Sequence, residues 1–246
     1  MIRPDSRITK TLLAWALCVS LAASQATAAL IDLTPAGNAS NSASSVSLAD
    51  LVNGAVMGLK VGDKEFTGFS YSRIGDMPPS DNVRVLGFRD SGGNWGISFH
   101  GAFLDLPGGS FSDALIRFMV NVAEAEAAAG WRINGANLFI GGAGAGGPDS
   151  AFIVDESFQE NDVLLEAYVT TLGGAQQAKT SDSATFAPVV KLNVTKDILA
   201  IAAAGNSLPA RATVIDQSFT QIPEPTSLAL LGMTGLAMVS VVRRRR

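Results

Sequence analysis

Between residues 56 and 219 the chain consists of short apolar runs that Gly, Pro, Asn or Asp residues separate. The clearest run places Ile116, Phe118, Val120 and Val122 on one face. An apolar residue at every second position is typical of a strand with one buried face. The runs predicted as strands are 56–61, 65–72, 83–89, 95–100, 115–122, 133–140, 151–154, 163–170, 184–194 and 211–219.

Departures from the alternation are few. The aromatic residues of the run 65–72 do not keep one parity, which predicts a β-bulge at Gly68. Residues 47–51 and 123–129 are predicted as single helical turns, and 196–204 as either a helical turn or a strand.

With 25 glycines punctuating the strands, the pattern predicts an all-β fold of two packed antiparallel sheets, a β-sandwich over residues 48–222. Residues 29–47, rich in Ser, Asn and Ala, are predicted to form a flexible leader.

The N-terminus has the three parts of a secretory signal peptide. A basic segment with Arg3, Arg7 and Lys10 precedes an apolar stretch over 11–23 and the small residues Ala26-Thr27-Ala28. We therefore expect residues 1–28 to be a signal helix that is removed before Ala29. An uncleaved N-terminal anchor is the alternative, and the small residues before Ala29 argue against it.

Cysteine chemistry is absent from the predicted mature chain. The only cysteine, Cys18, lies within the apolar stretch of the signal peptide. Disulfides and thiolate metal sites are therefore excluded after cleavage.

The C-terminus combines Pro223-Glu224-Pro225, an uncharged stretch over 227–242, and four arginines, Arg243, Arg244, Arg245 and Arg246. As a helix, the 16 residues of the stretch reach roughly 24 Å, somewhat less than a hydrocarbon core of about 30 Å. We expect a transmembrane helix whose arginine end is cytoplasmic, with long side chains that reach the headgroups. Everything before the two prolines would then lie outside.

This order of motif, helix and arginines resembles the PEP-CTERM sorting signal, here residues 223–246. The resemblance implies recognition by exosortase, a membrane-embedded, transpeptidase-like enzyme of Gram-negative bacteria that make extracellular polysaccharide. It assigns Pro223, Glu224 and Pro225 as the recognition residues of a substrate. The two prolines disfavour a helix and keep the segment extended and open to an enzyme's cleft. A tail-anchored protein with a proline-stiffened linker would explain the helix and arginines but not the motif before them.

The body of the chain also resembles a recurrent PEP-CTERM ectodomain. The shared segments are Leu48-Ala49-Asp50-Leu51, Val61-Gly62-Asp63-Lys64-Glu65-Phe66, Ser112-Asp113, Val194-Thr195-Lys196-Asp197-Ile198 and Ile215-Asp216-Gln217-Ser218-Phe219. This resemblance implies an exported β-sandwich and no known activity.

Removal of the end segments makes the remaining chain more acidic. Seven of the 18 basic and two of the 22 acidic residues fall in these segments, which leaves 11 basic and 20 acidic residues and a net charge of −9. Such a surface repels phosphate backbones, so nucleic acid is excluded as a partner.

Catalytic and cofactor motifs are weak. His100 is the only histidine, no G-x-S-x-G elbow accompanies it, and a strand-end histidine that faces solvent or caps a turn is the preferred interpretation. Gly142, Gly144 and Gly147 match G-x-G-x-x-G, but a strand-like segment follows instead of the helix that a dinucleotide site needs. We expect a flexible connection between strands there, and no cofactor.

Carboxylates and aromatic residues are the remaining candidates. Asp155, Glu156, Glu160 and Asp162 cluster in sequence, while Asp76, Asp81 and Asp90 lie in loop-like segments. Such oxygens suit Ca²⁺, although none has the spacing of an EF-hand loop, so solvated surface acids are the preferred interpretation and no metal ligand is assigned. A glycosidase pair cannot be chosen among them without geometry.

Sugars could stack on the aromatic residues Trp95, Trp131, Tyr71 or Tyr168, of which Trp95 follows a loop. A core of this size needs several aromatic side chains, so a structural role is the preferred interpretation.

The strand pattern and the PEP-CTERM resemblance together predict a non-enzymatic domain of the cell envelope or extracellular matrix, and the resemblance implies exosortase as its processing partner. The precursor would be anchored in the inner membrane with a periplasmic domain, and the product would reach the cell surface or matrix. An exopolysaccharide-binding module is one alternative, and a hydrolase that acts through two carboxylates is another.

Overall fold

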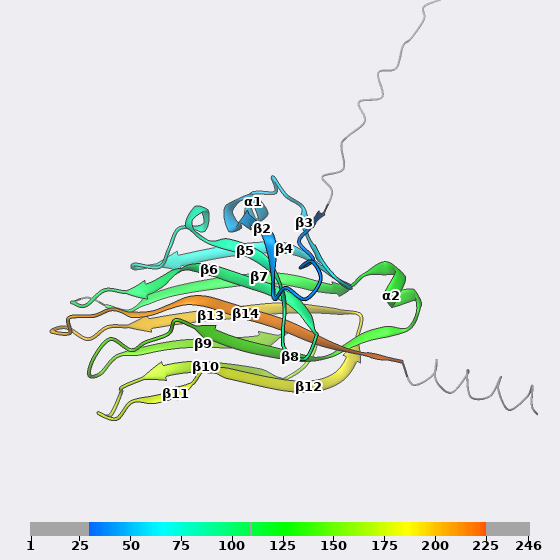
Figure 1. The fold of residues 1–246 in the computed structure, drawn as a ribbon. Coiled ribbons are helices and arrows are strands. Elements are labelled where there is room, and N and C mark those ends of the chain that lie inside the picture. The colour runs from blue at the N-terminus through cyan, green and yellow to red at the C-terminus, as the bar shows by residue number, and fades with distance from the viewer. Residues whose placement is uncertain (1–29, 109, 225–246) are drawn as a thin grey trace, which may run out of the picture.

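The strands of the protein form two sheets, as seen in a computed structural model that describes residues 30–108 and 110–224 (Figure 1). The strands are β1 (Ile31–Asp32), β2 (Asn41–Ser47), β3 (Gly58–Val61), β4 (Lys64–Ile74), β5 (Arg84–Arg89), β6 (Trp95–Asp105), β7 (Ser112–Val122), β8 (Trp131–Gly141), β9 (Ala151–Phe158), β10 (Leu164–Thr170), β11 (Gln177–Lys179), β12 (Ser181–Val189), β13 (Lys191–Ile201) and β14 (Ala210–Pro223). Sheet A has the order β1-β3-β4-β7-β13-β9-β10-β11, and sheet B the order β12-β8-β14-β6-β5-β2.

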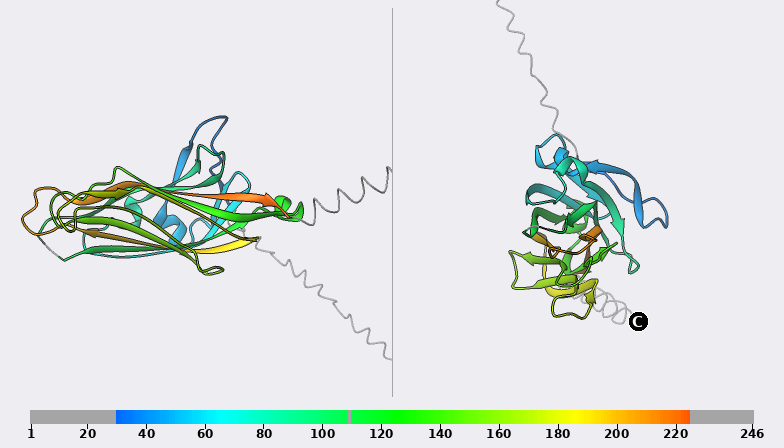
Figure 2. Two further views of the ribbon diagram at one scale, coloured as in Figure 1. Left: turned by 90° about the horizontal axis from the view of Figure 1, so that it is seen from below. Right: turned by 90° about the vertical axis from the view of Figure 1, so that its left-hand side faces the viewer.

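The sheets face each other along the length of the molecule, as two views at right angles show (Figure 2). All strand pairs are antiparallel apart from β1 with β3. The prediction of an all-β, two-sheet sandwich is therefore confirmed, with one parallel pair at the edge of sheet A.

Alternation along the central strands produces the core. In β7 the predicted inward residues Ile116, Phe118, Val120 and Val122 are all at most 4% exposed, while Arg117 between them is exposed. Burial of each large apolar side chain contributes about 1.5–3 kcal/mol relative to exposure. Four such residues on one face therefore determine which face of β7 points into the core.

Phe118 is the centre of an aromatic cluster that joins the two sheets. Its ring centroid lies 6.1 Å from that of Phe66 and 5.6 Å from that of Phe69, both on β4 of sheet A. Phe99 on β6 of sheet B lies 6.0 Å away. These separations are within the range in which aromatic pairs stabilise each other beyond their burial.

The predicted bulge at Gly68 is confirmed. The register between β4 and β7 shifts between Thr67 and Ser70, and Gly68 has a φ of +66°. The extra residue returns the strand to its face, because Phe66 and Phe69 are both buried.

Both predicted helical turns are present. The first is α1 (Leu48–Val52), whose N-cap Ser47 accepts a hydrogen bond from the Ala49 amide at 3.2 Å. The second is α2 (Glu124–Ala128), and a 3₁₀ turn, η1 (Ser80–Asn82), precedes β5. The segment 196–204, which was predicted as either a helical turn or a strand, continues β13 as far as Ile201.

The prediction of a flexible leader over residues 29–47 is wrong for the residues described. β1 pairs with β3, β2 pairs with β5, and Leu33 between them is 1% exposed. A Cβ on Gly87 would lie 1.8 Å from the Leu33 carbonyl oxygen, so this glycine allows the segment to pack closely. Edge strands gain backbone hydrogen bonds without needing apolar side chains, which is why composition did not reveal them.

The domain also extends further toward the C-terminus than the predicted boundary at residue 222, because β14 includes Pro223. Within residues 30–108 and 110–224, none of the helices has the length and apolarity needed to cross a membrane. The predicted signal helix 1–28 and transmembrane helix 227–242 lie outside the described residues.

Candidate functional site

The predicted sorting motif begins within the fold. Pro223 pairs with Trp131 at the start of β8, and the Glu224 amide donates a 2.7 Å hydrogen bond to the Gly130 carbonyl oxygen. The Glu224 carboxylate lies 2.6 Å from Nη2 of Arg132. In Figures 1 and 2 this end of β14 lies beside α2. Pro223 is extended within β14, and both Pro223 and Glu224 are bound to the domain.

Arg132 is held in place from the other side. Its Nη1 donates hydrogen bonds to the carbonyl oxygens of Ala127 at 3.0 Å and Trp131 at 2.8 Å. These bonds orient the guanidinium between the α2–β8 connection and Glu224. Gln221 adds a further anchor, because its Nε2 donates to Asp63 in the β3–β4 turn.

The other predicted sorting and cleavage residues cannot be placed. Pro225, Arg243, Arg244, Arg245 and Arg246, with Ala26, Ala28 and Ala29 at the signal cleavage point, lie outside the described residues.

His100 lies in the middle of β6, and the prediction of a strand-end position is wrong. Its Nε2 is 2.8 Å from Ser98 Oγ, and Ser98 donates a 2.5 Å hydrogen bond to Asp216 on β14. In a catalytic triad the carboxylate orients the histidine, whereas here it contacts the serine, which is fully buried. Burial raises the pKa of Asp216, although the Ser98 hydrogen bond opposes this. These three side chains do not have the arrangement of a triad.

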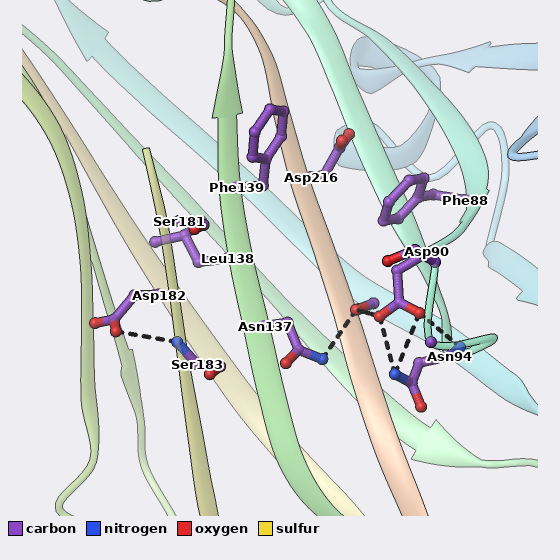
Figure 3. Close-up of a pocket in the computed structure, with 13 residues that line it drawn as sticks. Phe88, Asp90, Asn94, Asn137, Leu138, Phe139, Ser181, Asp182, Ser183 and Asp216 are labelled. Atoms are coloured by element: carbon purple, nitrogen blue, oxygen red, sulfur yellow. Dashed lines mark hydrogen bonds between the residues drawn. The ribbon is translucent and has the colours of Figure 1, made fainter. Parts of the chain in front are cut away.

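A hollow of about 480 Å³, the sheet-B groove, lies on the outer face of sheet B (Figure 3). It crosses β12, β8 and β14 and ends at the β5–β6 loop. Its side chains are mostly polar, with two aromatic rings: Phe88, Asp90, Asn94, Asn137, Phe139, Ser181, Asp182, Ser183, Asp216 and Ser218.

Hydrogen bonds order one end of the sheet-B groove. Asp90 accepts bonds from Ser218 Oγ at 2.6 Å and from Asn94 Nδ2 at 2.9 Å, while Asn137 donates to Ser218 at 3.1 Å (Figure 3). Burial acts to raise the pKa of Asp90, but these hydrogen bonds outweigh it and lower the pKa. The carboxylate is therefore a fixed, charged acceptor.

The aromatic residues named from the sequence contribute little to the sheet-B groove. The Trp95 ring has the Arg89 guanidinium 4.8 Å from its centroid, and a Cβ on Gly62 would lie 2.5 Å from the ring. Because Arg89 and Gly62 lie against the ring, Trp95 does not offer a free face for a sugar to stack on. Tyr71 donates a hydrogen bond to the Pro78 carbonyl oxygen, and burial raises the pKa of Tyr71 to about 12. Phe139, which sequence reasoning missed, is 43% exposed in the groove.

Two further aromatic residues lie elsewhere on the domain. Trp131 is 39% exposed at the start of β8, and Tyr168 is half-buried on β10.

The acidic cluster of residues 155–162 is divided by the strand alternation. Asp155 lies on the outer face of β9, Glu156 points into the core, and Glu160 binds Asn193. Asp162 is exposed. Asp155 instead faces Glu166 and Asp197 across neighbouring strands. Burial raises the pKa of Asp155, and these two carboxylates raise it further.

The remaining predicted acids also lie apart. Asp76 accepts a hydrogen bond from the Leu106 amide, Asp81 is in η1, and Asp90 is in the sheet-B groove. In the part of the chain that the structure describes, no three His, Cys, Asp or Glu side chains could together hold a metal ion.

The glycine-rich segment connects β8 to β9, and β9 follows it where a dinucleotide site would require a helix. Gly144 forms an isolated bridge with Arg211 on β14. The interpretation of the segment as a connection between strands is confirmed.

Two charged residues were missed by sequence reasoning. Arg132 gives no local signal, because its partner Glu224 is distant in sequence. Lys196 could have been found by parity, since it lies on the same face as Val194 and Ile198 and is fully buried.

A comparison with protein families bears on the C-terminus of the chain. No curated protein matches the chain. A family model for the PEP-CTERM protein-sorting motif matches residues 221–246, a range that includes the last residues of β14. The motif indicates an exported protein that is targeted to exosortase. The chain carries a PEP-CTERM protein-sorting motif.

Proposed function

We propose that exosortase processing delivers this β-sandwich to the cell envelope or extracellular matrix, where the domain has no enzymatic role. In this proposal residues 1–28 direct export, and the predicted helix 227–242 with its cytoplasmic arginines anchors the precursor. The position of the motif carries this proposal. Because Glu224 follows β14 directly, processing beyond this residue leaves the paired strands of the domain intact.

Two features support a non-enzymatic role. Ser98, His100 and Asp216 are hydrogen-bonded in an order that does not activate the serine. The carboxylates of Asp155, Glu166 and Asp197 lie side by side on the outer face of sheet A, whereas glycosidase acids flank a bound substrate.

Fractionation with intact-mass analysis tests the processing step. The native protein is compared between the producing bacterium and a strain that lacks exosortase. We expect loss of the C-terminal segment and surface or extracellular location only where exosortase is present. An identical mass and location in both strains would contradict the proposal. A variant ending at Glu224 serves as a control for release without an anchor.

Polysaccharide binding at the sheet-B groove is the second candidate. The exposed ring of Phe139 lies in the same groove as Asp90 and Asn137 (Figure 3). Sugars use such combinations, because their apolar faces stack on rings and their hydroxyl groups bond to carboxylates and amides.

Binding of the purified protein to the producer's exopolysaccharide, with and without Ca²⁺, tests this candidate. Phe139→Ala should weaken binding by about tenfold, which corresponds to about 1.4 kcal/mol. Trp131→Ala is the matched control, because Trp131 is 39% exposed on the same strand but does not line the groove. Equal binding by both variants, or no binding by the native protein, would remove this candidate.

A further inference from the structure

A cluster of three polar side chains lies inside the otherwise apolar space between the sheets. Lys196 on β13 and Glu156 on β9 are direct cross-strand neighbours in sheet A, and Gln217 on β14 faces them from sheet B. All three side chains are fully buried. Each occupies an inward position that the strand pattern otherwise fills with apolar residues such as Val194 or Ile215.

The Lys196 amine contacts both the acid and the amide. Lys196 Nζ is 3.0 Å from Gln217 Oε1, and it also contacts Glu156 Oε2. Glu156 Oε1 and Gln217 Nε2 have no hydrogen-bond partner within the described residues, although both atoms are buried. Buried polar atoms without partners are costly and rare, so a cluster that leaves two of them calls for a chemical reason.

Burial favours the uncharged forms of both ionisable groups. It lowers the pKa of Lys196 and raises that of Glu156, and in each case the charge of the partner opposes the shift only in part. A neutral lysine amine has a free electron pair and is a nucleophile. A neutral glutamic acid can donate a proton to a leaving group.

We propose that Lys196 and Gln217 form an intramolecular amide crosslink between sheets A and B, with Glu156 as the catalytic proton carrier. The Nζ electron pair attacks Cδ of Gln217, and a new Nζ–Cδ bond forms. Glu156 donates its proton to Nε2, the Cδ–Nε2 bond breaks, and ammonia leaves. The carboxylate then takes a proton from Nζ and returns to its starting form. An amine and a primary amide thus become a secondary amide and ammonia, with no oxidant, reductant or cofactor.

The product resolves the hydrogen-bonding problem of the cluster in part. Nε2, one of the two unpartnered atoms, leaves as ammonia, and the new amide N–H lies beside the Glu156 carboxyl group. The crosslink would also strengthen an exported domain that has no cysteine for disulfides, since Cys18 is the only cysteine of the chain. A covalent link between β13 and β14 restricts the unfolded chain in the same manner as a disulfide.

Tryptic peptide mass analysis of the full chain tests the proposal. Without the link, trypsin cleaves after Lys191, Lys196 and Arg211 and releases residues 192–196 and 197–211. With the link, Lys196 is acylated and resists cleavage. We then expect residues 192–211 joined to the peptide that begins at Ala212, with a mass one ammonia lower than the sum of the two.

Lys64 is an internal control in the same digest. It is 1% exposed and contacts Asp63, but within the described residues it bonds to no amide side chain. Trypsin should therefore cleave after Lys64 as usual. Complete release of residues 192–196 and 197–211 from the folded native chain would overturn the proposal. A loss of water in place of ammonia, with Glu156 in the linked peptide, would overturn the choice of Gln217.

Three variants separate the roles of the residues. Glu156→Gln keeps the size of the side chain but removes its acidic proton, so the crosslinked peptide should disappear. Gln217→Leu should abolish it as well. Gln221→Leu changes a glutamine on the same strand that contacts Asp63 instead, and it should leave the link intact. Persistence of the crosslinked peptide in Glu156→Gln would show that Glu156 is not the proton carrier.

Discussion

Replacement of Arg132 by alanine is expected to release the beginning of the sorting motif from the domain. Glu224 is bound through its carboxylate to Arg132 and through its amide to Gly130. The variant removes the first contact and leaves the second. An enzyme that binds Pro223-Glu224-Pro225 in a cleft needs these residues free, so the docked state competes with recognition.

The size of the effect follows from the exposure of the pair. The side chains of Arg132 and Glu224 are 18% and 36% exposed, and ion pairs near solvent contribute about 0.2–1 kcal/mol. Loss of about 0.5–1 kcal/mol changes the ratio of free to docked motif by about two- to fivefold. The remaining backbone hydrogen bond keeps the docked state populated.

Hydrogen exchange at the Glu224 amide measures this ratio directly, because the amide is protected by the Gly130 carbonyl oxygen. We expect about two- to fivefold faster exchange in the Arg132→Ala variant. The initial rate of exosortase processing should increase by a similar factor if release precedes recognition.

Arg84→Ala is the matched control, since Arg84 is exposed on β5 and forms no ion pair within the described residues. It should change neither exchange nor processing. Unchanged exchange in Arg132→Ala would refute the assigned strength of the contact. Faster exchange with slower processing would instead indicate that the docked motif is the form that the enzyme recognises.

Three further predictions concern the stability of the domain. Phe118→Ala should lower the free energy of unfolding by about 3–5 kcal/mol in chemical denaturation, whereas Phe111→Ala, at a site that is 47% exposed, should change it by at most about 0.5 kcal/mol. Burial and then Asp197 raise the pKa of Asp113. A carboxyl group whose pKa is raised in the folded state stabilises the protein at low pH, and this contribution is lost as pH rises through the raised pKa. Asp197→Asn should therefore stabilise the protein by about 0.5 kcal/mol at neutral pH and not near pH 3, and an equal gain at both pH values would contradict the electrostatic cause. Gly87→Ala should cost about 1–3 kcal/mol and increase exchange at the Leu33 amide, because its Cβ would collide with the Leu33 carbonyl oxygen; unchanged exchange would refute this packing argument.

Local patterns predicted much of the secondary structure. The inward face of β7, the bulge at Gly68 and both helical turns follow from residues close in sequence. The same local reasoning failed for β2, because an edge strand of Ser, Asn and Ala is held by backbone pairing with β5. It also failed for His100, since the length of β6 depends on its neighbours β5 and β14.

The candidate sites depended on contacts that the sequence does not contain. The acidic run around Asp155 is contiguous in sequence, yet alternation sends Glu156 into the core and leaves Asp155 outside. The sheet-B groove draws its residues from four separate segments, 88–94, 137–139, 181–183 and 216–218. Arg132 meets Glu224 only because β8 and β14 are neighbours in sheet B.

By itself, the sequence determined the sorting motif and the β-sandwich class, because both depend on residues that are close together in the sequence. The motif is contiguous, and the strands follow from an apolar residue at every second position. Only the tertiary structure decided that Glu224 is docked and that Lys196 meets Glu156 and Gln217, which are 40 and 21 positions away. Strand order and register bring these side chains into contact, and both depend on packing of the whole core. The fully buried Lys196 thereby lies beside an amide and a carboxyl group.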